Sequence, residues 1–140
     1  MTSAASPVLE VSGLTRAFGG LVAVSGVNLQ IARGEIFGLV GPNGSGKTTL
    51  VNAITGFYPP QKGSIALNGA DITGLAPHKV ARRHVARTFQ NLALFNGMTV
   101  LDNVTCAPRS AGRGTDAEIT KRAKDLLDRV GLAEKAGEHP

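Results

Sequence analysis

A glycine-rich segment constrains the fold more than any other part of the sequence. It fits the pattern G-x-x-x-x-G-K-[ST] in full, with Gly41 and Gly46 as the fixed glycines, Lys47 as the cation and Thr48 as the hydroxyl. Glycines at 41, 44 and 46 let the backbone take positive φ and approach phosphate oxygens closely. Lys47 would reach the β- and γ-phosphates of a nucleotide, and the Thr48 hydroxyl would complete the coordination of a magnesium ion.

The residues on either side of this segment strengthen the prediction. Residues 36–40 form an apolar run typical of a buried strand, and Leu50, Ala53 and Ile54 follow at helical spacing before Gly56. The first N–H groups of a helix have no partner within the helix, and the helix dipole places partial positive charge there. The alternative is an ordinary glycine-rich turn between a strand and a helix, which this context disfavours. The sequence therefore predicts nucleotide binding.

Composition and charge exclude several other classes of protein. The 140 residues are 42% hydrophobic and 18% charged, as in globular domains, and the single cysteine excludes an internal disulfide. The first seven residues do not suit a secretory signal, and no apolar run approaches the roughly 18 residues that span a bilayer. The net charge is +5. Because the basic residues are dispersed and not interleaved with aromatics, we do not expect nucleic-acid binding.

Alternation, turn signals and caps predict the remaining elements. We expect strands at 8–11, 22–31, 63–67 and 84–89, a hairpin turn at Asn68-Gly69, helices at 77–83 and 99–107, and a linker at 108–114. A further helix begins at the capping box Thr115-Asp116-Ala117-Glu118 and ends at Gly131. It carries an apolar stripe that we expect in the core, formed by Ile119, Ala123, Leu126, Leu127 and Val130.

Phe18 is followed by two glycines and lies a short distance before the glycine-rich segment. An aromatic at this place could stack on a purine ring. It could equally be a core phenylalanine beside a flexible turn, and spacing alone does not separate the two interpretations.

Over residues 8–134 the chain resembles the ATPase subunit of ATP-binding cassette (ABC) transporters. The resemblance rests on GLVGPNGSGKTTL, followed by Gly-Ser-Ile and Asn-Gly-Ala-Asp-Ile. The segment RTFQN at 87–91, with Leu94-Phe95, Met98-Thr99-Val100 and Asp102-Asn103-Val104, is similar to the subgroup that powers branched-chain amino acid uptake in bacteria. The resemblance implies an α/β fold, in which a P-loop NTPase core carries an N-terminal antiparallel β subdomain and leads into a helical subdomain.

The resemblance also implies a role for each matching position. Phe18 matches the aromatic that stacks on adenine, and Val24 would flank the same ring. Gln90 matches a glutamine that reaches magnesium and the attacking water, so that Lys47 and Gln90 would serve catalysis; the alternative for Gln90 is an ordinary loop amide at a strand end. Leu92, Leu94 and Phe95 match the segment that faces the membrane subunit. The nucleotide-contacting positions would be Gly41, Pro42, Asn43, Gly44, Ser45, Gly46, Lys47, Thr48 and Thr49.

The implied organisation is a tail at 1–7, a nucleotide-binding core at 8–90 and the beginning of a helical subdomain at 91–140. The implied function is ATP and Mg²⁺ binding that drives import of a small solute, branched-chain amino acids, through membrane-spanning permease subunits. The implied partners include a second ATPase subunit in a homo- or heterodimer. The implied location is peripheral, at the cytoplasmic face of the inner membrane.

Four elements that the family needs for hydrolysis find no match in the sequence: a magnesium-binding Asp, an adjacent Glu as general base, a Ser-Gly-Gly signature and a later switch histidine. We therefore expect the first half or so of a full subunit, with little turnover of its own and with residues 36–40 missing a neighbouring strand. The alternative is a truncated nucleotide-binding or interaction module without catalysis. A P-loop kinase or GTPase is disfavoured because Asn-Lys-x-Asp is absent.

Overall fold

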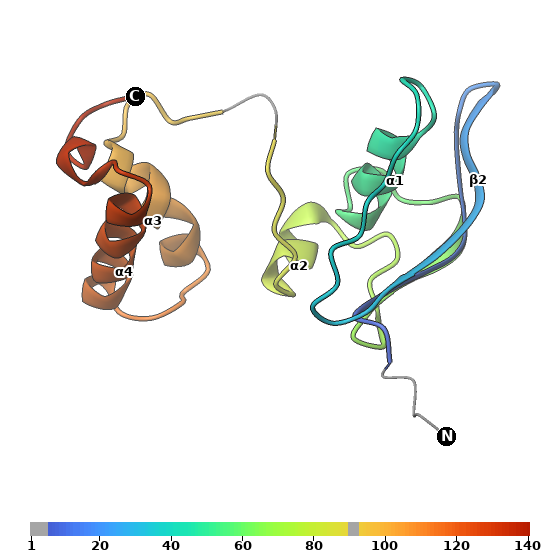
Figure 1. Cartoon of the computed structure of the whole chain (residues 1–140), viewed down its shortest axis with the longest axis horizontal. Helices are drawn as coiled ribbons and strands as arrows, with labels where there is room; N and C mark the ends of the chain where they lie inside the picture. The colour runs from blue at the N-terminus through green and yellow to red at the C-terminus, as the bar shows by residue number, and fades with distance from the viewer. Residues whose placement is uncertain (1–5, 90–92) are drawn as a thin grey trace. The chain divides into compact units, whose positions relative to one another are not determined.

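The computed structural model describes residues 6–89 and 93–140, and the chain divides into two compact units, Met1–Arg87 and Thr88–Pro140. Each unit is described by itself (Figure 1). The division into a nucleotide-binding core at 8–90 and a helical subdomain from 91 stays a prediction.

The first unit is built on an antiparallel sheet of four strands in the order β2-β1-β3-β4. The strands are β1 (Leu9–Phe18), β2 (Leu21–Ile31), β3 (Lys62–Leu67) and β4 (Ala70–Asp71). Strand β1 is much longer than the predicted 8–11, because it pairs with both β2 and β3. The predicted antiparallel β subdomain is confirmed.

The turn between β3 and β4 has the conformation that the Asn68-Gly69 pair predicts. Asn68 and Gly69 both take positive φ, 48° and 77°. Two consecutive left-handed residues make a turn whose twist matches that of the flanking strands, and Asn-Gly is the pair that adopts it most readily. The predicted hairpin is therefore present.

Two helices complete the first unit. Helix α1 (Lys47–Ile54) directs Leu50 and Ala53 into the core, and α2 (Pro77–Arg82) contributes Val80. Burial of apolar side chains is the main favourable contribution to folding, and here it fixes α1 to the sheet. The buried core consists of Val11, Leu14, Val24, Leu50, Ala53, Ile65, Ile72 and Val80.

Two strands predicted in this unit, at 36–40 and 84–89, are absent. Among residues 6–89 and 93–140, neither segment pairs with a strand, and Ile36 and Val40 are 99% and 94% exposed. A strand needs a neighbour for its N–H and C=O groups, and apolar character does not supply one. In addition His84 has φ 67°, a left-handed conformation that is unfavourable for a residue with a Cβ and departs from strand geometry.

The second unit contains α3 (Val100–Ser110), α4 (Asp116–Arg129) and the short 3₁₀ helix η1 (Ala133–Lys135). Helices α3 and α4 lie side by side (Figure 1). Helix α3 begins at Thr99, whose hydroxyl accepts a hydrogen bond from the Asp102 amide at 3.1 Å. The helix continues through Pro108, so the predicted linker is wrong over 108–110. A proline in the last turn removes only one backbone donor, and the helix tolerates it there.

The apolar stripe of α4 is only partly buried. Ile119, Ala123 and Leu127 are buried as predicted, whereas Leu126 and Val130 are exposed. Among the described residues of this unit, α3 and η1 are the elements that pack most on α4. The stripe is therefore wider than the surface that covers it, and its prediction as core was wrong for these two residues.

The capping box that was predicted for α4 is present. The Thr115 hydroxyl accepts from the Glu118 amide at 3.3 Å, and the Glu118 carboxylate accepts from the Thr115 amide and hydroxyl, both at 2.8 Å. The bond from the backbone amide, followed by that from the hydroxyl, lowers the pKa of Glu118 below its ordinary value.

This lowered pKa gives a prediction about acid stability. A carboxyl whose pKa is lower in the folded state stabilises the fold above its unfolded pKa, and that contribution is lost as the pH falls through the folded value. The Glu118→Gln variant keeps the capping geometry without the charge. We expect its thermal midpoint, followed by circular dichroism, to lie below that of the parent at pH 7, and this difference to be smaller at about pH 3. An equal gap at both pH values would contradict the charge effect.

Candidate functional site

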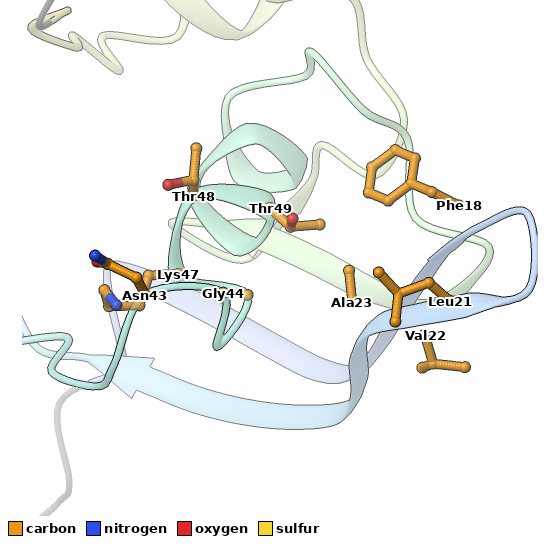
Figure 2. A pocket seen from close by; sticks show the side chains of 10 residues that line it. Phe18, Leu21, Val22, Ala23, Asn43, Gly44, Lys47, Thr48 and Thr49 are labelled. Atoms are coloured by element: carbon orange, nitrogen blue, oxygen red, sulfur yellow. The ribbon is translucent and has the colours of Figure 1, made fainter.

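Some of the predicted phosphate and base contacts line one cavity of about 350 Å³ in the first unit. In Figure 2, Phe18 lies at one end of this cavity and the glycine-rich loop at the other, with Ala23 of β2 and Thr49 of α1 between them. The lining residues are Phe18, Leu21, Val22, Ala23, Asn43, Gly44, Gly46, Lys47, Thr48 and Thr49.

The loop is held in place by close contact with β2. Gly46 has φ 87°, and a Cβ built on it would overlap the backbone oxygen of Ala23 and lie 3.0 Å from Val24 Cγ2. Only glycine adopts this conformation without strain and leaves room for β2. The fixed glycine of the pattern therefore lets the loop pack directly on the strand that forms the wall of the cavity.

The Lys47 ammonium is bonded inside the loop. Its Nζ donates hydrogen bonds to the carbonyl oxygens of Gly41 at 2.5 Å and Pro42 at 2.6 Å. These bonds hold the two ends of the loop at a fixed separation and keep a full positive charge beside the cavity. The loop is therefore shaped before any ligand arrives.

The N-terminus of α1 opens beside the same cavity. Its N-cap is Gly46, no side chain caps it, and no acidic residue occurs in its first turn. Thr48 and Thr49, both in that first turn, line the cavity. The helix thus presents unpaired backbone donors, two hydroxyls and the positive end of its dipole, an arrangement suited to an anion.

Some predicted contacts lie elsewhere. Gly41, Pro42 and Ser45 do not line this cavity; they line a second hollow of about 300 Å³, to which Gly46 and Lys47 also contribute.

Val24, predicted to flank the base, is instead buried in the core, and Leu21, Val22 and Ala23 line the cavity. The pairing of β1 and β2 explains the difference. Arg16 pairs with Val24 and Ala17 with Val22, so Ala23 is an extra residue on β2. Such a bulge interrupts the alternation of faces along a strand. Alternation along the strand does not reveal this bulge, so no sequence signal indicated that these three residues line the cavity.

Gln90 and Leu92 lie outside the described residues. Leu94 and Phe95 belong to the second unit and are exposed. The segment that leads towards Gln90 is attached to α1 by Arg87, whose Nη1 donates to Asn52 Oδ1 at 2.6 Å and to Thr55 Oγ1 at 3.1 Å. The phosphate-facing helix and this segment therefore share a polar link.

Two further findings concern the described part of the chain. It holds no cluster of three or more histidine, cysteine or acidic residues placed to bind a metal ion. In the same residues, no helix combines the length and the apolar character needed to cross a membrane.

The chain is similar in sequence to several proteins of known description. The chain is 44% identical to the high-affinity branched-chain amino acid transport ATP-binding protein BraF of Pseudomonas aeruginosa, over 93% of the chain and 56% of the relative. It is 42% identical to LivG of Escherichia coli, a protein with the same description, with the same coverage. The spermidine/putrescine import ATP-binding protein PotA of Nitrosospira multiformis is 46% identical over 89% of the chain and 33% of that protein. The chain thus spans about half the length of the curated relatives BraF and LivG.

Solved structures agree with these relatives. The ADP conformation of an ATP-binding cassette of an ABC transporter superposes with a TM-score of 0.81 at 28% identity, over 95% of the chain and 57% of that structure. A nucleotide-free ATP-binding cassette gives a TM-score of 0.79 at the same identity and coverage. The family model described as ABC transporter matches residues 24–140. With its glycine-rich loop, its cassette fold and this match, the chain belongs to the ABC transporter family.

Proposed function

We propose that the chain is part of the ATP-binding subunit of an ABC importer and binds magnesium-ATP in the cavity between Phe18 and the glycine-rich loop. One observation carries the proposal: a single cavity has cationic and unpaired N–H groups at one end and an aromatic ring at the other. A nucleotide has the matching form, with a polyanion at one end and a flat ring at the other.

At the loop end, the triphosphate would accept hydrogen bonds from the amides at the start of α1 and from Lys47. The ammonium would exchange its present carbonyl partners for phosphate oxygens. Charge-assisted bonds of this kind are stronger than bonds between neutral groups, which favours the exchange.

Magnesium would be held between phosphate oxygens and the Thr48 hydroxyl, and we propose that Gln90 completes its surroundings. The donor set fits the ion, because Mg²⁺ prefers oxygen ligands and is commonly bound through substrate phosphates with few protein groups. The ion would neutralise charge on the phosphates. Lys47 would orient the same oxygens and stabilise the charge that develops on them in phosphoryl transfer.

We expect binding to exceed turnover in the chain itself. None of the described residues lining the cavity carries a carboxylate that could accept a proton from water. Positioning and charge stabilisation alone leave the attacking water without a general base.

For the whole protein we propose uptake of branched-chain amino acids. BraF and LivG, which are named for that transport, match 93% of the chain, whereas PotA, named for polyamine import, matches 89% of it. The proposal includes membrane-spanning permease subunits, a second ATPase subunit and a peripheral place at the cytoplasmic membrane face. It includes the division into a nucleotide-binding core at 8–90 and a helical subdomain beginning at 91.

The test is titration calorimetry of the chain with ATP and with inorganic tripolyphosphate, each with magnesium. We expect both to bind and ATP to bind more tightly. Base stacking on an aromatic ring contributes about 1–3 kcal/mol, so Phe18→Ala should weaken ATP roughly tenfold and tripolyphosphate little. Phe37→Ala is the matched control, since Phe37 is 43% exposed against 39% for Phe18 and lies outside the cavity. If ATP does not bind at all, the proposal is wrong. If Phe18→Ala weakens ATP and tripolyphosphate equally, Phe18 has a packing role and does not stack on the base.

A further inference from the structure

The ring of Phe18 is held by two residues that do not line the cavity. The Tyr58 ring meets it edge-on, with centroids 5.2 Å apart and an interplanar angle of 78°. The Arg16 guanidinium carbon lies 4.9 Å from the centroid of Phe18 and 5.9 Å from that of Tyr58. Edge-to-face rings and a cation over a ring face are both favourable geometries. Phe18 therefore lines the cavity, and the two residues that contact its ring lie outside the cavity.

The Arg16 guanidinium makes one hydrogen bond and two ring contacts, and one of its buried nitrogens has no hydrogen-bond partner among the described residues. Its Nη1 donates to the Pro59 carbonyl at 2.9 Å, whereas its buried Nε has no hydrogen-bond partner among the described residues. A buried polar atom without a partner is unfavourable and calls for a compensating interaction. The guanidinium also lies over the two aromatic rings, so these ring contacts and the Pro59 hydrogen bond together hold it.

The segment that carries Tyr58 is itself fixed to β1. The Gln61 amide donates to the Thr15 carbonyl at 2.9 Å, and the Ala17 amide donates to Gln61 Oε1 at 2.7 Å. These two bonds lie on either side of Arg16. The segment therefore cannot shift along β1 without breaking both of them.

The same segment starts at the C-terminal end of α1. The amides of Phe57 and Tyr58 both donate to the Asn52 carbonyl, at 2.9 and 3.3 Å. The N-terminal end of this helix carries Lys47 and Thr48. Helix α1 therefore connects the loop end of the cavity with the Phe18 end.

We propose that Arg16 and Tyr58 are positioning residues that hold the Phe18 ring for a purine base, and so make the site prefer a nucleotide to a bare triphosphate. This inference rests on the proposed function. Phe18 is the last residue of β1, is 39% exposed, and precedes the turn Gly19-Gly20. A ring in that place would rotate freely without lateral contacts, and a base would have to immobilise it on binding. A ring already fixed in its binding orientation removes that unfavourable entropy.

The test compares ATP with tripolyphosphate in two matched variants. Tyr58→Leu removes the ring, and Tyr58→Phe keeps the ring without the hydroxyl. We expect Tyr58→Leu to weaken ATP about three- to tenfold with less than a twofold effect on tripolyphosphate, and Tyr58→Phe to retain the parent affinity for both. Arg16→Met should resemble Tyr58→Leu. A loss of ATP affinity below twofold in Tyr58→Leu, or equal losses for the two ligands, overturns the inference.

A double variant separates positioning from general loosening of the fold. If Tyr58 acts through Phe18, Tyr58→Leu should have no further effect on ATP affinity in a Phe18→Ala background. Additive losses would show that Tyr58 acts by another route and overturn the inference.

The parent chain provides a readout that needs no variant. It contains one tyrosine and no tryptophan, so its tyrosine emission reports on Tyr58 alone. We expect ATP, after correction for adenine absorption, to change this emission and tripolyphosphate to leave it unchanged. The same response to both ligands would overturn the inference even if Tyr58→Leu failed to fold. A parent chain that binds neither ligand would instead overturn the proposed function.

Discussion

Replacing Lys47 with alanine is expected to reduce magnesium-ATP affinity at least about a hundredfold, since hydrogen bonds from charged groups are worth about 1.5–3 kcal/mol each and Lys47 supplies more than one. Its Nζ already bonds two carbonyl oxygens of the loop, so the variant loses both the charge and the bonds that shape the loop. Affinity for tripolyphosphate should fall equally, because Lys47 meets the phosphates and not the base. Calorimetry with both ligands measures the loss.

The matched control for this variant is Lys79→Ala. Lys79 lies on α2 and does not line the cavity, yet its removal changes the net charge by the same amount. If general electrostatic attraction were responsible, the two variants would lose similar affinity, and at raised salt both losses would shrink. ATP affinity unchanged in Lys47→Ala would remove the basis for placing the triphosphate in the loop.

Gly46→Ala is expected to damage both the stability of the first unit and its ATP binding. The alanine would have to adopt φ 87° and its Cβ would overlap the Ala23 carbonyl oxygen. Left-handed backbone costs an ordinary residue about 1–2 kcal/mol, and overpacking a close contact adds about 1–3 kcal/mol. We expect a loss of roughly 2–5 kcal/mol in the free energy of unfolding, measured with denaturant, and no detectable ATP binding in the surviving folded chain.

Gly44→Ala separates the two causes. Gly44 has φ 83°, nearly the same conformation, but nothing lies within 4 Å of a Cβ built there. This control should show the backbone cost alone, near 1–2 kcal/mol. If both variants lose the same stability, the close approach of the loop to β2 contributes nothing and the strain is entirely in the backbone.

The features that the sequence predicted well depend on neighbours within a few residues. The capping box at Thr115 and the Asn68-Gly69 turn are complete within four residues or fewer, and both are present. The glycine-rich loop belongs to the same class, because its shape follows from its own glycines and from Lys47. Local chemistry determines such features wherever the rest of the chain permits them.

The features that it missed depend on distant partners. Whether residues 36–40 form a strand depends on a neighbouring strand, which apolar character does not reveal. The exchange of Val24 for Val22 at the cavity follows from an extra residue in the pairing of β1 with β2. The contact of Arg16 with Pro59 spans 43 residues, so no spacing rule could have indicated that Tyr58 and Phe18 meet.

Helix α1 is eight residues long and therefore extends for only about 12 Å. A helix this short should open as a single unit, so its amide hydrogens should exchange with deuterium as one cooperative group. Occupancy at either extremity of the cavity would slow exchange along its whole length. Protection of the α1 amides from hydrogen exchange would therefore report on bound nucleotide, whether the base or the phosphates bind first.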